Sequence, residues 1–132
     1  MAILYEVKER KNPQTPGQPG KFYPGVVRTQ TITFNAITKE IAARSTVSKA
    51  DAAAVLISFE ELIIEHLKNS NGVRLGSLGI IYPTLKGSGA PSAEEFNAKD
   101  HITEVMVRFR AAKSLKDEVQ DAEFKRVEFD AL

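Results

Sequence analysis

The stretch TVSKADAAAVLISFEELIIEHLKNSNGVRLGSLG, residues 46–79, decides the fold. Ser48 and Asp51 have the spacing of a helix N-terminal cap. The segment NSNG at 69–72 supplies the polar and glycine residues that end a helix. Between these two signals, apolar residues recur at helical spacing. The stretch therefore predicts a long helix that begins after Ser48 and ends at about residue 67 or 68.

This predicted helix is apolar on two flanks. One flank carries a stripe at i, i+3, i+4 and i+7 spacing, formed by Ala52, Val55, Leu56, Phe59, Leu62, Ile63 and Leu67. The other flank carries Ala53, Ile57 and Ile64. One small domain has little with which to cover both flanks, so we expect a second copy of the chain to bury part of this helix. An enclosing N-terminal hairpin is the alternative.

Before the long helix, the sequence predicts a β hairpin and a short helix. Residues 3–9 and 25–33 are rich in apolar and β-branched residues, as strands are. Between them lies KNPQTPGQPGK at 11–21, whose three prolines and two glycines exclude both helix and strand. Thr33 is placed to cap a helix that begins near Phe34.

After the long helix, the apolar period changes from that of a helix to that of strands. The segments 73–75 and 80–85 predict two short extended pieces, and residues 102–111 alternate between two faces. From Pro83 to Glu104 there is no helical or strand pattern, and a loop of that length is usually functional or disordered. A short helix and a terminal strand are expected last, in AAKSLKDEVQ at 111–120 and EFKRVEF at 123–129.

Composition limits the class of protein. The 132 residues are 42% hydrophobic and 27% charged, which is typical of one globular domain. There is no cysteine and there are only two histidines, so we expect neither disulfides nor a metal or other cofactor. No apolar run approaches the roughly 20 residues that span a bilayer. Glu6 interrupts the N-terminus too early for a signal peptide, so a cytoplasmic protein without a membrane partner is expected.

Charge is distributed unevenly along the chain. The formal net charge is only +1, yet residues 1–30 hold five basic and two acidic side chains, whereas residues 111–132 hold four and six. No segment is a polybasic tail. A nucleic-acid partner would therefore have to be held by a local patch of basic residues.

The sequence offers little for catalysis. Glu60 and Glu61 are adjacent on the predicted helix and so diverge by about 100°. His66 stands alone on that helix, and Ser114 has no base at a recognisable spacing. The glycines of GSLG and GSG do not have the pattern of a phosphate-binding loop. We therefore expect no enzymatic activity and no small-molecule substrate.

The order of these elements resembles a known family. Two helices, the pair VRLGSLGIIYP, a long connection, a strand ending in VRFR and the helix AAKSLKDEV are similar to the HU and integration-host-factor family of bacterial histone-like DNA-binding proteins. The similarity covers about residues 34–120. The outer parts, YEVKERKNPQTPGQPGKFY and EFKRVEF, resemble the extensions of a longer branch of such proteins.

The resemblance implies an α+β fold in an HU-like intertwined homodimer. Two N-terminal helices, a small antiparallel sheet with a projecting β arm and a short C-terminal helix would be joined by an N-terminal hairpin and a C-terminal strand. The chain would form a single HU-like domain, with an N-terminal β extension at 1–33, an HU-like core at 34–120 and a C-terminal extension at 121–132.

The resemblance also implies a sequence-tolerant architectural protein of the nucleoid that binds duplex DNA as a dimer, with bending as the contribution of the arm. The alternative is an HU-like fold used as a protein-interaction or structural module without DNA binding. That alternative arises because residues 83–104 hold Lys86 and Lys99 against four acidic residues, and an acidic arm is repelled by phosphate.

The expected DNA contacts near the root of the arm are Arg74, Ser77, Arg108, Arg110, Lys113 and Lys116. Strand alternation directs Arg108 and Arg110 to one side, opposite the inward Val105, Val107 and Phe109. The two lysines share one side of the following helix, at i and i+3. By resemblance these basic residues meet the phosphate backbone, and the arginine and serine at 74 and 77 match a turn that adds a contact. Alternatively, Arg108 pairs with Glu104 and the lysines are only solvated.

Within the arm, Lys86, Pro91 and Lys99 are the remaining candidates for DNA contact. Pro91 stands near a glycine-rich tip, where a proline is either a wedge between base pairs or an ordinary turn residue. The segment NPQT at 12–15 resembles the wedge tip of ordinary relatives, but it precedes the first helix. We therefore expect residues 11–21 to be a hairpin connector.

Overall fold

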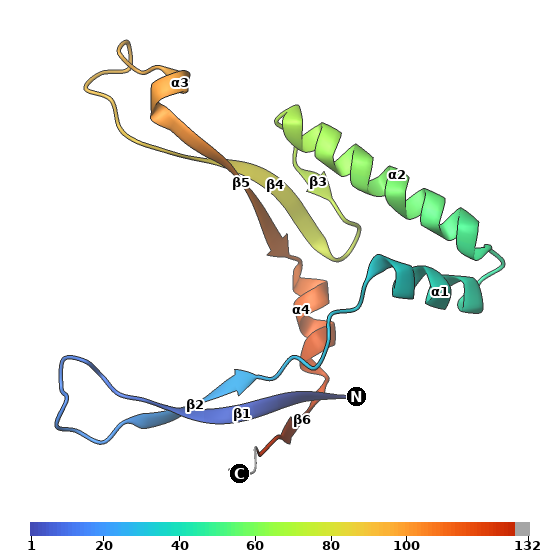
Figure 1. Ribbon diagram of the computed structural model, residues 1–132, viewed down its shortest axis with the longest axis horizontal. Helices are drawn as coiled ribbons and strands as arrows, with labels where there is room; N and C mark the ends of the chain where they lie inside the picture. The colour runs from blue at the N-terminus through green and yellow to red at the C-terminus, as the bar shows by residue number, and fades with distance from the viewer. Residues whose placement is uncertain (129–132) are drawn as a thin grey trace. The chain divides into compact units, whose positions relative to one another are not determined.

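The computed structural model describes residues 1–128 of the chain (Figure 1). It divides into two compact units, which we call the terminal unit (1–32 and 118–128) and the central unit (33–117). The elements are, in order, β1 (Ala2–Arg10), β2 (Lys21–Val26), α1 (Phe34–Arg44), α2 (Lys49–Lys68), β3 (Val73–Arg74), β4 (Gly79–Gly87), α3 (Ala98–His101), β5 (Ile102–Ala111), α4 (Lys113–Gln120) and β6 (Glu123–Arg126). This arrangement confirms the α+β class. The grouping of the whole chain into one domain stays a prediction.

The terminal unit is a three-stranded sheet made from both ends of the chain. Its strand order is β2-β1-β6, with β2 antiparallel and β6 parallel to β1. The predicted second strand at 25–33 is wrong, because pairing with β1 begins at Lys21 and ends at Val26. The local sequence pattern does not predict this pairing, because Pro24 is unfavourable within a strand. β2 is an edge strand, where proline is tolerated. The last strand is confirmed at 123–126, while Phe129 lies outside the described residues.

The first two helices of the central unit, α1 and α2, begin where their caps predict. Thr33 Oγ1 accepts a hydrogen bond from Ala36 N at 3.2 Å, and Ser48 Oγ accepts one from Asp51 N at 3.1 Å. Each bond satisfies an amide that the first turn of a helix leaves without a partner. Asn69 follows the last residue of α2, and Ser70 takes a positive φ of 67°. The chain therefore turns away from α2 within the polar segment that the sequence indicated.

The sheet of the central unit has the order β3-β4-β5, with antiparallel neighbours (Figure 1). β3 pairs only with Ile80 and Ile81, so the rest of β4 and β5 continues as a two-stranded ribbon. The predicted patternless connection at 83–104 is therefore wrong for most of its length, and only residues 88–97 join the ribbon to α3. Strand pairing organises this segment, and Gly87 permits it, since a Cβ there would collide with the carbonyl of His101.

The described residues bury very little apolar surface within this one chain. Ala52 is the only hydrophobic residue among them that is fully buried, and Thr38 is the only such polar residue. Large apolar side chains of α2 remain more than half exposed, among them Val55, Ile57 and Ile64. Within residues 1–128, no helix is both long enough and apolar enough to cross a bilayer.

Candidate functional site

One face of the β3–β4–β5 sheet gathers three arginines from two strands. Arg74 pairs with Ile80, and Ile80 pairs with Arg110, so these three residues form one row across the sheet. Residues opposite one another in antiparallel strands project to the same face. Arg108 pairs with Tyr82 in the next row on that side. We call the surface formed by Arg74, Arg108 and Arg110 the cationic face.

Tyr82 contacts one arginine of the cationic face. The guanidinium carbon of Arg110 lies 5.9 Å from the centroid of the Tyr82 ring, within the range of a cation–π contact. Both arginines of β5 are exposed to solvent. The alternative in which Arg108 pairs with Glu104 is not adopted, since no residue of the described range forms an ion pair with Arg108. The arginines therefore keep their charge available for an anionic partner.

The start of α4 continues from the end of β5 and is fixed to the turn before β4. Ala112 N donates a hydrogen bond to the carbonyl of Leu78 at 2.9 Å, and Ser114 Oγ donates one to the carbonyl of Ser77 at 2.8 Å. These bonds hold the first turn of α4 beside the root of the sheet. Lys113 and Lys116 are exposed residues of this helix. The structure therefore brings Ser77 and both lysines close in the fold to the arginines of the sheet.

The arm candidates lie elsewhere. Lys86 projects from the cationic side of the ribbon but opposite Glu104, which offsets its charge. Pro91 is exposed in the connector 88–97, and Lys99 belongs to the single turn of α3. The connector and α3 have local order of their own, since the rings of Phe96 and His101 stack with centroids 5.0 Å apart. The structure does not bring Pro91 or Lys99 to the cationic face.

The opposite face of the same sheet is apolar. It carries, on β4 and β5, Ile81, Pro83, Leu85, Val105, Val107 and Phe109. With Ile64 and Leu67 of α2, part of this face lines an open groove of about 800 Å³. The predicted alternation along β5 is confirmed, but its apolar members are only partly covered, since Val105 is 63% exposed. We call this surface the apolar face.

Sequence reasoning missed Tyr82 and treated Arg74 only as part of a turn. Both assignments depend on the register between strands, which a single strand pattern does not contain. The alternation of Ile80, Tyr82 and Thr84 was the available signal, because it places the tyrosine on one side of β4. Within residues 1–128, no three histidine, aspartate or glutamate side chains are grouped to hold a metal ion.

The chain matches a known protein family and is similar in fold to a solved structure. The model of a family described as "HU domain fused to wHTH, Ig, or Glycine-rich motif" matches residues 1–126. No curated protein sequence matches the chain. A crystal structure of a candidate bacterial DNA-binding protein from Bacteroides vulgatus ATCC 8482 is similar in fold, with a TM-score of 0.71 at 15% identity. The similarity covers 98% of this chain and 50% of that one, so the chain spans about half the length of that protein.

Proposed function

Because the chain belongs to the family of HU domains fused to wHTH, Ig or glycine-rich motifs, we propose that it binds duplex DNA through the cationic face. In this proposal it is a sequence-tolerant architectural protein, and no catalysis is involved. The description of the Bacteroides vulgatus protein as a candidate DNA-binding protein supports the same partner. The site of action would be the bacterial nucleoid in the cytoplasm.

The observation that carries the proposal is the arginine row on an ordered sheet. A guanidinium presents a planar fork of N–H donors that matches the oxygens of a phosphate, and it is always charged at neutral pH. Arg74, Arg108 and Arg110 project to one side from paired strands, so their spacing is set by the backbone. Neighbouring strands lie about 4.8 Å apart, so the row across three strands spans roughly 10 Å. Lys113 and Lys116 would extend this surface along α4.

Phosphate contacts of this kind position a protein without reading bases. The three arginines project from a sheet and not from a recognition helix of the kind that lies in a major groove. The proposal therefore predicts affinity that depends little on sequence and strongly on salt.

We propose further that the active form is a homodimer. The evidence for this is the exposed apolar surface on α2 and the apolar face, which a lone chain leaves in water at a cost of about 25 cal/mol for each Å². A second copy would cover these surfaces and leave the cationic face outward, because the two faces are on opposite sides of one sheet. Two cationic faces would then act on one duplex.

The arm is proposed to deform DNA rather than to supply most of the affinity. Glu94 and Glu95 in the connector oppose phosphate electrostatically. Pro91 is exposed there and offers an apolar wedge, and wedges of this type kink a duplex by partly unstacking a base step. Lys86 and Lys99 would offset part of the repulsion.

The second candidate function is a protein-interaction module built on the same fold. The acidic residues of the connector and the open apolar groove favour it, because both suit a protein partner better than phosphate. This candidate predicts no duplex binding even at low salt.

The test is a titration of labelled duplexes of unrelated sequence with the wild type and with the double variant Arg108→Glu/Arg110→Glu. The proposal requires the wild type to bind all duplexes alike and the variant to lose affinity for each. Equal binding by both proteins would show that the cationic face is not the DNA contact. Absence of binding by the wild type would favour the interaction module.

A further inference from the structure

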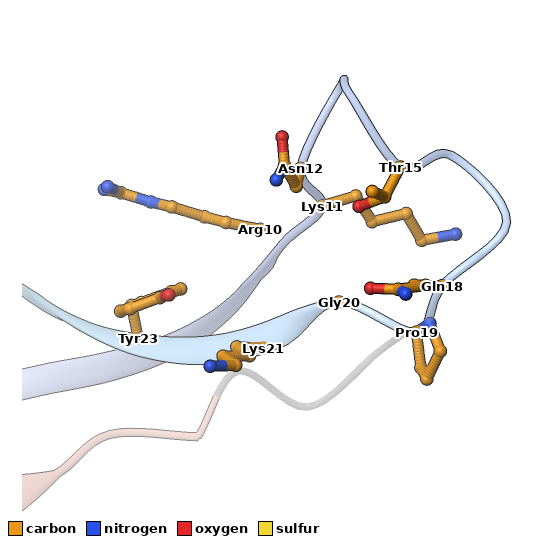
Figure 2. A pocket seen from close by; sticks show the side chains of 9 residues that line it. All are labelled: Arg10, Lys11, Asn12, Thr15, Gln18, Pro19, Gly20, Lys21 and Tyr23. Carbon is orange, nitrogen blue, oxygen red and sulfur yellow. The ribbon is translucent and has the colours of Figure 1, made fainter.

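A second basic site lies at the end of the β1–β2 hairpin, in the terminal unit. A cavity of about 620 Å³ is present there, and it is lined by Arg10, Lys11, Asn12, Thr15, Gln18, Pro19, Gly20, Lys21 and Tyr23 (Figure 2). Three of these residues are cations and none is acidic. We call this cavity the hairpin pocket. It belongs to no part of the cationic face, which lies entirely in the central unit.

The register of the hairpin places Arg10 and Lys21 on the same side of β1 and β2. Arg10 pairs with Lys21, and Lys8 pairs with Tyr23, so all four side chains project to one side of β1 and β2. The guanidinium carbon of Arg10 lies 5.7 Å from the centroid of the Tyr23 ring, and Figure 2 shows the two side chains along one another. Tyr23 therefore fixes the Arg10 side chain along the strands by a cation–π contact, and Figure 2 shows its guanidinium directed away from the loop.

Carboxylates near the hairpin do not neutralise these cations. Glu6 forms an ion pair with Lys8 at 2.8 Å, further along the strand. Glu9 projects to the other side of β1, and its Oε1 accepts a hydrogen bond from Gly20 N at 3.2 Å. Of the residues that the structure describes, none forms an ion pair with Arg10, Lys11 or Lys21. A bound anion would therefore offset the charge of these cations.

The loop that closes the hairpin pocket has internal order. Asn12 Oδ1 accepts a hydrogen bond from Gln14 N at 3.0 Å, and the carbonyl of Asn12 accepts one from Thr15 N at 3.1 Å. Gln18 N donates to the carbonyl of Thr15 at 3.1 Å. Three prolines restrict the backbone between these bonds. Figure 2 shows the side chains of Lys11, Thr15 and Gln18 within the bend of the loop, with the ammonium group of Lys11 directed away from Arg10.

We propose that the hairpin pocket is a second DNA contact, which binds the phosphate backbone of the duplex through Arg10, Lys11 and Lys21. The inference rests on the proposed function and adds to it a contact made by the N-terminal extension. Phosphate is the matching chemistry because three cations and no acidic residue line an open, exposed site, and the guanidinium of Arg10 presents a fork of N–H donors. A backbone contact outside the central unit would add to the phosphate contacts of the cationic face.

The test compares two triple variants in duplex titrations at several salt concentrations. The pocket variant is Arg10→Gln/Lys11→Gln/Lys21→Gln. The control variant is Arg28→Gln/Lys125→Gln/Arg126→Gln, which removes the same charge from the same unit but leaves the pocket intact. Circular dichroism and thermal unfolding establish that both variants keep the wild-type fold.

The pocket variant is expected to flatten the plot of log affinity against log salt by about 0.9 for each phosphate that it no longer binds, and so by up to about 2.7. The control is expected to match the wild type. A pocket variant with the wild-type slope and affinity overturns this inference alone, provided that Arg108→Glu/Arg110→Glu still weakens binding. Failure of the wild type to bind any duplex overturns the proposed function as well.

A second measurement needs no variant of the pocket. In the isotope-labelled wild type, addition of a short duplex is expected to shift the backbone amide resonances of Lys11, Gly17, Gly20 and Lys21. Glycine amides are useful reporters because they resonate apart from most others. Shifts confined to the sheet and α4 of the central unit would overturn the inference, and so would pocket shifts that an acidic peptide produces and the duplex does not.

Discussion

The two faces of the β3–β4–β5 sheet are built from the same strands and differ in nearly every other respect. On one side, alternate residues of β4 and β5 place Tyr82, Arg108 and Arg110 in water beside Arg74 of β3. On the other side, the residues between them are apolar, and Val105, Val107 and Leu85 are more than half exposed. An arginine side chain is stabilised by hydration, whereas a valine side chain is more stable when it is buried against other apolar groups. The comparison indicates that each face needs a different partner, an anion for one and an apolar surface for the other.

The largest effect is expected from acidic substitutions on the apolar face. Leu85 and Val105 are cross-strand partners that line the groove, and we expect Leu85→Asp/Val105→Asp to yield monomers or unfolded chains. Burying two unpaired carboxylates at a protein interface costs several kcal/mol. Sedimentation velocity at micromolar concentration would measure the change in mass.

A pair of exposed connector residues provides the control for this experiment. Ser88→Asp/Ala93→Asp adds the same charges at positions that do not line the groove. It is expected to remain dimeric. A wild type that sediments as a stable monomer would contradict the proposed role of the apolar face.

A smaller effect, on binding and not on assembly, is expected from the cationic face. Arg108→Glu/Arg110→Glu should weaken binding to every duplex by roughly 10²- to 10⁴-fold, because the loss of two charged hydrogen bonds at about 1.5–3 kcal/mol each removes about 3–6 kcal/mol. The salt slope should fall by about 0.9 for each phosphate no longer bound. Lys39→Glu/Lys49→Glu, which reverses two exposed cations of α1 and α2, is the control and should bind almost as the wild type does. If the arginine variant lost affinity for some duplex sequences and not for others, the result would argue against phosphate contacts.

The arm is expected to change DNA shape more than affinity. Pro91→Ala removes the exposed ring from the connector and leaves all charges in place, so the salt slope should stay at the wild-type value. Energy transfer between dyes at the two ends of a duplex would report a smaller bend angle. Unchanged bending would identify Pro91 as a turn residue.

The smallest effect is expected from the hairpin loop itself. Replacement of residues 12–20 by a Gly/Ser connector of equal length keeps Arg10, Lys11 and Lys21, and it removes no core contact. Stability and DNA affinity should stay nearly unchanged. A large decrease in affinity at unchanged stability would assign the DNA contact to the loop side chains, such as Asn12 and Thr15, and not to the cations at its ends.

The helices and the sheet of this protein differ in how far the sequence predicts them. α1 and α2 begin at the expected caps, because capping depends on residues three positions apart, such as Ser48 and Asp51. The predicted bounds of the arm and of the second strand are wrong, because pairing of β4 with β5 and of β1 with β2 joins residues distant in sequence. Pro24 in an edge strand and Gly87 beside His101 are compatible with strands only in that context.

The candidate site shows the same division. The alternation of β5 predicts that Arg108 and Arg110 share a side, and the structure places them so. Arg74 is placed in the same row only by its pairing with Ile80. The position of Tyr82 beneath Arg110 depends on the register of β4. The cross-strand pairing of Arg10 with Lys21 likewise depends on a hairpin register, which the loop with its three prolines does not indicate. The roles of all these residues in DNA binding stay predictions.

The salt dependence of duplex binding by the wild-type protein is the decisive measurement for phosphate binding by the cationic face and α4. Five basic side chains of one chain, at positions 74, 108, 110, 113 and 116, are assigned to phosphates, and each contact contributes about 0.9 to the slope. The account predicts a plot of log affinity against log salt that is linear, steeper than about −4, and the same for duplexes of unrelated sequence. Affinity that does not change with salt, or no binding at low salt, would contradict it.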